Sequence, residues 1–180
     1  MPSKTAVKEK SSTQGEKGRG QEAAEPARRP ASKDTPVGAH LENGLSDDPW
    51  LGQVARWDDA EADTRIREGL PFDLAAHLQS LLDLTDEEAA HLIGRSRSTY
   101  ARYRNKDQDL GAPEAERAVR FARLLALAAD TFGSLKEAKE WMLEENYALG
   151  GAKPFELAET DPGARIVRDL LWGIQHGHPV

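Results

Sequence analysis

The stretch "TDEEAAHLIGRSRSTYARYRNK", residues 85–106, decides the fold of this chain. It opens with Thr-Asp-Glu-Glu, the pattern of a capping box, and the apolar residues that follow predict a helix. Gly94 predicts the end of that helix, and Ser96 is expected to cap a second helix over about 97–105. Two short helices joined by a glycine turn form the arrangement of a helix-turn-helix.

The second helix of this pair is basic inside an acidic chain. The whole chain has a net charge of -7, and residues 41–94 carry 13 acidic and 3 basic groups, whereas residues 95–110 carry 5 basic and 2 acidic groups. A helix in this position lies in the major groove of DNA, where arginine binds guanine and hydroxyls and cations contact phosphates. Tyr100 and Tyr103 are expected to pack inward. The five cations of residues 95–106 have no acidic residue among them. The residues expected to bind DNA are Arg95, Arg97, Ser98, Thr99, Arg102, Arg104 and Lys106. A solvated basic face on an ordinary helix pair stays open as the alternative.

Helical patterns continue on both sides of this motif. Apolar residues at intervals of three and four predict a helix whose first turn contains Pro71. A long helix is expected over 114–132, apolar nearly all round in its second half. Ser134 is expected to cap a further helix over 135–145. Pro154 begins a short helix, and Asp161 is expected to cap the last one, with the proline after it in first position. The apolar face of the last helix is expected to consist of Ala164, Val167, Leu170, Leu171 and Ile174. Because no alternating β-branched run occurs, the fold class is all-α.

Composition excludes several classes of protein. The absence of cysteine excludes disulfides and cysteine-based zinc sites. No apolar run approaches the roughly 18 residues that span a bilayer, and no signal sequence is recognisable, so a cytoplasmic protein is expected. His176 and His178 lack a carboxylate or thiol partner nearby, so no metal site is expected. Gly150 and Gly151 are not followed by the lysine of a phosphate loop, and no nucleophile or acid–base motif occurs, so neither an enzyme nor a cofactor is expected.

The carboxy-terminal third carries a resemblance to a known family. Its sequence is "SLKEAKEWMLEENYALGGAKPFELAETDPGARIVRDLLWGIQHG", residues 134–177. The pattern residues are Ala138, Trp141, Asn146, Leu149, Gly150, Gly151, Pro154, Gly163, Ala164, Val167 and Gly177. This order of elements resembles the toxin-binding domain of the Xre/MbcA/ParS family of antitoxins. The preceding half resembles the Xre-like helix-turn-helix of the same family at Thr99, Arg102, Arg104, Glu116 and Arg117, so the resemblance covers about residues 70–180.

The resemblance implies the neutralising half of a type II toxin–antitoxin pair. The expected partner is a RES-domain toxin that degrades NAD or uses it to ADP-ribosylate a target. The antitoxin is expected to be a homodimer within a hetero-oligomer, to repress its own operon by binding operator DNA, and to have no enzymatic activity. Its carboxy-terminal end is expected to reach toward the NAD pocket of the toxin. The residues implied in toxin binding are Trp141, Asn146, Leu149, Gly150, Gly151, Pro154, Trp172, Gly177, His178, Pro179 and Val180.

The expected organisation has four parts. Residues 1–40 are poor in large apolar side chains and are expected to be disordered. Residues 41–70 are expected to be a partly helical linker or arm, residues 71–132 the helix-turn-helix DNA-binding and dimerisation domain, and residues 133–180 the toxin-binding domain. Two other functions stay open, a stand-alone helix-turn-helix transcriptional regulator without a toxin and an interaction module with a vestigial helix-turn-helix.

Overall fold

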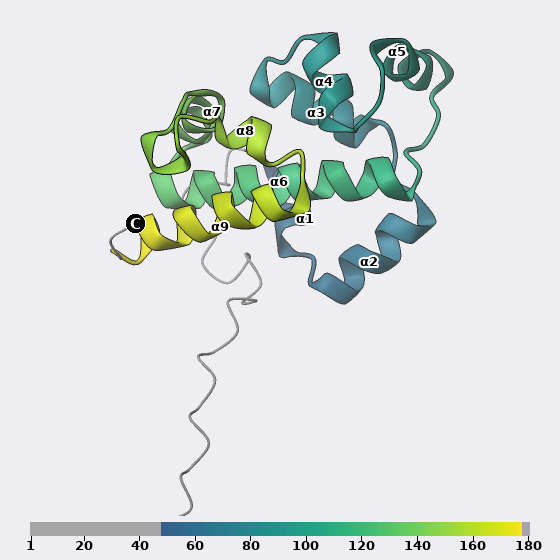
Figure 1. The fold of residues 1–180 in the computed structure, drawn as a ribbon. Helices are drawn as coiled ribbons and strands as arrows, with labels where there is room; N and C mark the ends of the chain where they lie inside the picture. The colour runs from purple at the N-terminus through teal and green to yellow at the C-terminus, as the bar shows by residue number, and fades with distance from the viewer. Residues whose placement is uncertain (1–47, 178–180) are drawn as a thin grey trace, which may run out of the picture. The chain divides into compact units, whose positions relative to one another are not determined.

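The computed structural model describes residues 48–177, and these residues form an all-α fold (Figure 1). The expected fold class is therefore confirmed, and the described residues contain no strand beyond an isolated bridge between Leu70 and Leu110. The helices are α1 (Pro49–Arg56), α2 (Asp59–Glu68), α3 (Asp73–Leu82), α4 (Asp86–Leu92), α5 (Arg97–Lys106), α6 (Ala112–Phe132), α7 (Leu135–Leu143), the 3-10 turn η2 (Tyr147–Leu149), α8 (Pro154–Leu157) and α9 (Asp161–Gln175). The expectation of disorder for residues 1–40 lies outside the described residues. Between residues 48 and 177, no helix is long and apolar enough to cross a membrane.

Most helices begin where the sequence predicts a cap. The Thr85 side chain accepts a hydrogen bond from the Glu88 backbone N–H, and the Glu88 carboxylate accepts one from the Thr85 backbone N–H, so the capping box is complete. Ser96 and Ser134 cap α5 and α7, where each side chain accepts a hydrogen bond from the backbone N–H three residues later. Gly133, with a φ of 83°, ends α6 in the left-handed conformation that favours glycine.

Two helix starts differ from the expectation. The cap of α9 is Thr160, whose Oγ1 accepts a hydrogen bond from the Gly163 backbone N–H at 3.1 Å. Asp161 already has a helical position, and its carboxylate pairs with Arg165 one turn later, so its expected role as the cap is wrong. Pro71 precedes α3 and its cap, Phe72, rather than lying in the first turn.

The long helix α6 is the centre of the fold. Residues 124–129 are all buried, in agreement with the apolar pattern of this segment. The helices α1 to α4 and the helices α7 and α9 pack against α6, as Figure 1 shows. One buried helix therefore supports both the helix-turn-helix half and the carboxy-terminal half of the described chain.

The segment expected to be a linker or arm packs against α6 from Asp48 onward. Leu51 and Val54 of α1 are at most 1% exposed and belong to the same core as α6. On α6, the Arg123 guanidinium donates to the Trp57 carbonyl oxygen at 2.7 Å and to the Asp59 carboxylate at 2.8 Å. The described part of this segment is thus folded structure, because its apolar residues belong to the core and its polar groups bond to Arg123, which lies more than 60 residues later in the chain.

Candidate functional site

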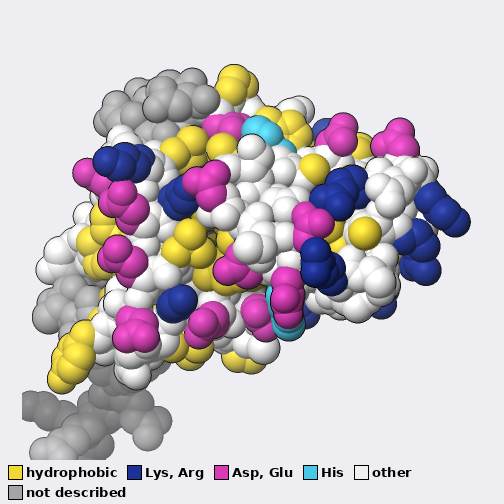
Figure 2. All heavy atoms as spheres, turned by 90° about the horizontal axis from the view of Figure 1, so that it is seen from above, with side chains coloured by type: hydrophobic (Ala, Val, Ile, Leu, Met, Phe, Trp, Pro, Cys, Tyr) yellow, Lys and Arg dark blue, Asp and Glu magenta, His cyan; other side chains and the backbone are white. Residues whose placement is uncertain are grey.

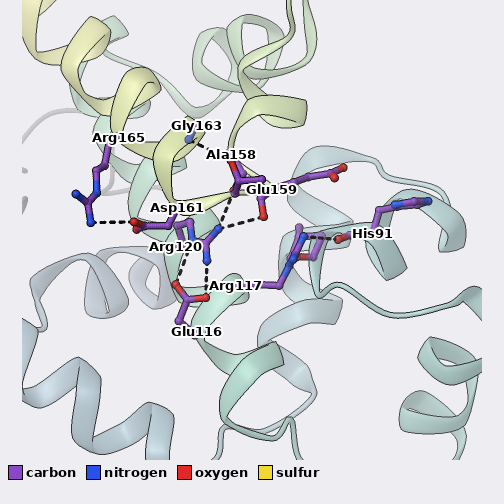
Figure 3. Close-up of polar contacts among 11 residues, drawn as sticks. His91, Glu116, Arg117, Arg120, Ala158, Glu159, Asp161, Gly163 and Arg165 are labelled. Atoms are coloured by element: carbon purple, nitrogen blue, oxygen red, sulfur yellow. Dashed lines mark hydrogen bonds and ion pairs between the residues drawn. The ribbon is translucent and has the colours of Figure 1, made fainter.

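The turn between α4 and α5 is built on Gly94 and Arg117. Gly94 has a φ of 69°, and a Cβ at this position would lie 2.9 Å from Nε of Arg117. The Arg117 guanidinium, on α6, donates to the carbonyl oxygens of Leu92 and His91 at 3.3 and 3.4 Å, as Figure 3 shows for His91. Glycine is required at this turn for its backbone conformation and for the close approach of Arg117. Arg117 in turn satisfies carbonyl groups at the end of α4.

The orientation of α5 is set by two buried tyrosines, as the sequence predicts. Tyr100 is fully buried and Tyr103 is 6% exposed, and Phe72 packs on both rings. The Tyr100 hydroxyl donates to the Gln79 side-chain oxygen at 2.9 Å. Burial of the phenol, and after it the nearby Asp86 carboxylate, raises the pKa of Tyr100 from 10.0 to about 12, so the hydroxyl stays protonated and able to donate even above pH 10. These contacts leave the opposite side of α5 exposed.

Two of the five cations in the motif have acidic partners within the fold. Arg95 pairs with Glu114, which is 1% exposed at the start of α6. Arg104 makes two hydrogen bonds to the Asp86 carboxylate, at 2.8 and 3.0 Å. These bonds, together with one from Gln79, hold the pKa of Asp86 below its ordinary value. The expectation of five unopposed cations is therefore wrong, because the two opposing carboxylates lie 18 and 19 residues away in sequence.

The other expected DNA contacts lie at the surface. Arg97, Arg102 and Lys106 are exposed and make no ion pair with another described residue. Ser98, Arg102 and Lys106 are spaced by four residues and therefore share one face of α5. Thr99 is half-buried and donates its backbone N–H to the cap Ser96. Figure 2 shows Lys and Arg side chains concentrated toward the end of the molecule where Figure 1 places α5.

In the carboxy-terminal half, the Asn-x-x-Leu-Gly-Gly motif forms a closed turn around η2. The Asn146 side-chain oxygen accepts a hydrogen bond from the Ala148 backbone N–H at 2.9 Å, and its carbonyl oxygen accepts one from Gly151 at 2.9 Å. Gly150 and Gly151 have φ values of 70° and 86° and are exposed. Leu149 is half-buried against the core. These hydrogen bonds fix the shape of the turn, and the surface of the motif consists of the two glycines and of the two residues between Asn146 and Leu149.

The Gly163-Ala164 pair of the motif brings α9 close to α8. A Cβ on Gly163 would lie 1.9 Å from the Leu157 carbonyl oxygen, a distance that no side chain can occupy. At the end of α8, the Arg120 guanidinium donates to the carbonyl oxygens of Ala158 and Glu159 at 3.3 and 3.2 Å (Figure 3). Arg120 lies three residues after Arg117 on α6, so neighbouring arginines hold a helix end in each half of the chain.

The remaining residues implied in toxin binding divide into internal and surface groups. Pro154 is buried, and Trp141 is half-buried and packs on Phe132 with ring centroids 5.4 Å apart. Trp172 is half-buried and stacks on His176, with ring centroids 4.2 Å apart. Gly177 is exposed. His178, Pro179 and Val180 lie outside the described residues.

The structure also exposes three large hydrophobic residues that the sequence did not single out for binding. Tyr147 is 99% exposed, Ile166 is 53% exposed and Ile174 is 41% exposed. The sequence predicts Ile174 on the apolar face of α9, whose other members are buried. It is exposed because it lies in the last turn of the helix, next to exposed Gln175 and His176. The helical period gives the face on which a side chain lies but not the point at which the core beneath it ends. In residues 48–177, no three histidine or acidic side chains are grouped closely enough to hold a metal ion.

The two halves define a two-domain helical protein in which a helix-turn-helix is followed by a small helical domain. Residues 61–123 match the antitoxin Xre-like helix-turn-helix domain, and residues 127–177 match the antitoxin Xre/MbcA/ParS C-terminal toxin-binding domain. The chain is 31% identical to an "Antitoxin Xre" of Yersinia enterocolitica and 28% identical to an "Antitoxin Xre" of Photorhabdus laumondii. Each similarity extends over 113 residues, which is 62% of this chain and 76% of the relative. The chain belongs to the Xre family of antitoxins.

Proposed function

We propose that this chain neutralises a cognate RES-domain toxin that acts on NAD and represses its own operon by binding operator DNA as a homodimer. The observation that carries the proposal is the presence of both family domains, one after the other, on a single folded unit. In this proposal, residues 71–132 bind DNA and form the dimer, and residues 133–180 bind the toxin. The chain then acts by binding, without an enzymatic step of its own.

The proposed DNA contacts are the exposed cations of α5 that make no ion pair with a described residue. Arg102→Ala is expected to weaken operator binding by about 1–3 kcal/mol if Arg102 contacts a base, whereas Lys106→Ala weakens all sequences about equally. Fluorescence anisotropy with the DNA upstream of the gene measures both effects, and the matched control is Lys136→Ala, which removes an exposed cation of α7. Operator affinity should fall steeply as salt is raised, because phosphate contacts release counterions. An affinity independent of salt would contradict DNA binding by this face.

Toxin neutralisation is tested with the product of the gene adjacent to this one. Co-expression followed by affinity purification should yield a complex of the two proteins, and growth assays should show that the toxin is harmless only when this chain is present. Failure of the full-length chain to bind a neighbouring RES-domain protein would favour a stand-alone transcriptional regulator.

The finer part of the proposal concerns how the toxin is inhibited. Residues 177–180 are proposed to enter the NAD pocket of the toxin, where the terminal carboxylate would meet the basic groups that otherwise bind phosphate. Deletion of these four residues should preserve DNA binding and most toxin binding but restore toxin activity, measured as NAD loss or ADP-ribosylation. A deletion variant that still protects cells fully would show that inhibition takes place by covering or distorting the toxin.

A further inference from the structure

The three exposed large hydrophobic residues of the described chain all lie in the domain that matches toxin binding. Tyr147, Ile166 and Ile174 fall within residues 127–177, whereas no large hydrophobic side chain in residues 48–126 is exposed. A single exposed hydrophobic residue is ordinary on a protein surface. Here the distribution is uneven between two halves of one folded unit, and we infer that these three residues are the apolar anchors of the toxin interface. This inference rests on the proposed function.

Tyr147 is held outward by a rigid turn. The hydrogen bonds from Gly150 N–H to the Tyr147 carbonyl oxygen, at 3.0 Å, and from Gly151 N–H to the Asn146 carbonyl oxygen close the turn on itself. The 99% exposure of Tyr147 means that its ring contributes almost nothing to the core of this chain. A tyrosine on a fixed backbone loses only two side-chain torsions on binding, so its burial in a partner costs little conformational entropy.

The two isoleucines lie on the helix that packs against this turn. The turn η2 contacts α9, and Ile166 and Ile174 are both on α9. Their separation of eight residues corresponds to about 12 Å along the helix axis. Three apolar side chains on two elements in contact suit a protein surface with matching depressions, since buried aromatic and aliphatic groups dominate protein–protein interfaces.

The charges near Tyr147 indicate the kind of partner. Glu144 and Glu145 directly precede the turn, are exposed and make no ion pair with another described residue. Acidic side chains beside the proposed anchor disfavour DNA and favour a protein surface that places basic groups around an apolar depression. The proposed partner is the cognate toxin, because the anchors lie within the residues that match the toxin-binding domain. The test distinguishes it from a second copy of this chain.

The test measures the dissociation constant of the complex between the full-length chain and the toxin encoded by the adjacent gene, for wild type and for variants of the chain. Tyr147→Ala should weaken binding about thirtyfold, the scale of an interface hot spot. Ile166→Ala and Ile174→Ala should weaken it by smaller factors. Tyr147→Phe retains the ring and should bind within about twofold of wild type, and the surface substitution Gln53→Ala on α1 is the matched control. Operator affinity and the thermal midpoint of Tyr147→Ala should equal those of wild type, because the side chain has no internal contacts to lose.

Three outcomes would overturn the inference. Toxin binding by Tyr147→Ala within twofold of wild type would remove Tyr147 from the interface while leaving the proposed function intact, since the wild-type chain still binds. A loss of self-association by Tyr147→Ala with unchanged toxin affinity would show that the anchors join two copies of this chain. Absence of binding by the wild-type chain would overturn both the inference and the proposed function.

Discussion

The helix-turn-helix half and the carboxy-terminal half of this chain share α6 but expose opposite chemistry. Over its buried tyrosines, α5 presents Arg97, Arg102 and Lys106 to solvent. The carboxy-terminal half instead exposes Tyr147 and the two isoleucines of α9. Folding therefore leaves charge at the surface of the first half and large apolar side chains at the surface of the second. Our proposal is that each half binds its partner through the side chains that folding leaves exposed.

Arginine has two uses in this chain, since some arginines stabilise the fold and others are proposed to bind DNA. Arg95 and Arg104 belong to the basic motif, yet their partners are carboxylates of this chain. Arg117 and Arg120 are internal as well, since their guanidinium groups bind backbone carbonyl groups at the ends of α4 and α8. A cation in the sequence is therefore a candidate for binding only when the fold supplies no acidic or carbonyl partner.

The largest expected effect separates structural from recognition arginines. Arg95→Ala should lower the free energy of unfolding by about 3 kcal/mol, because it leaves the buried Glu114 carboxylate without its partner. Arg102→Ala should change the free energy of unfolding by about 0.5 kcal/mol or less, because its side chain is exposed and makes no ion pair with a described residue. Urea unfolding of both variants tests the distinction. Equal stability of the two variants would mean that Arg95 is not a structural residue.

A slightly smaller effect is expected in the carboxy-terminal half. Gly163→Ala places a Cβ against the Leu157 carbonyl oxygen and should destabilise the fold by about 2–3 kcal/mol, because α9 must move away from α8. The matched control is Gly150→Ala, where the space is open and only the positive φ of 70° is unfavourable, at a cost of about 1 kcal/mol. Thermal unfolding should rank wild type above Gly150→Ala and Gly150→Ala above Gly163→Ala. The reverse order of the two variants would show that close packing of α8 on α9 is unimportant.

The smallest expected effect concerns the hydroxyl that orients α5. Tyr100→Phe removes the hydrogen bond to Gln79 and should cost about 1 kcal/mol. Because the pKa of Tyr100 is raised from 10.0 to about 12 in the folded state, the stability linked to its proton is present below pH 10 and is lost as the pH rises through 10 toward 12. Phenolate absorbance should show a step near pH 12 that Tyr100→Phe lacks. If the step that the variant lacks lies near pH 10 instead, Tyr100 is in contact with solvent and its pKa is not raised.

The sequence predicts local features of the fold well. The caps Thr85, Ser96 and Ser134 are confirmed, because a cap depends on a few neighbouring residues. The cap of α9 was placed one residue late because Thr160 and Asp161 are adjacent and both can cap, and the proline that follows fits the first turn in either case.

Features that depend on distant parts of the chain could not be predicted from local patterns. The packing of α1 on α6 and the Arg95–Glu114 pair join residues that are far apart in sequence. The exposure of Ile174 depends on where the core beneath α9 ends, which helical periodicity does not specify. Tyr147 does carry a local signal, since it directly follows a capping asparagine and lies three residues before the Gly-Gly pair.

The central proposal is that the two halves of the chain bind DNA and toxin through separate surfaces. Its most direct test measures both affinities for two variants of the full-length chain. Operator affinity and toxin affinity are measured for Arg102→Ala and for Tyr147→Ala under the same buffer conditions. Arg102→Ala should lose about tenfold or more in operator affinity and bind the toxin within about twofold of wild type. Tyr147→Ala should lose toxin affinity and bind the operator within about twofold of wild type. A loss of both affinities in either variant, with the thermal midpoint unchanged, would contradict the separation of the two faces.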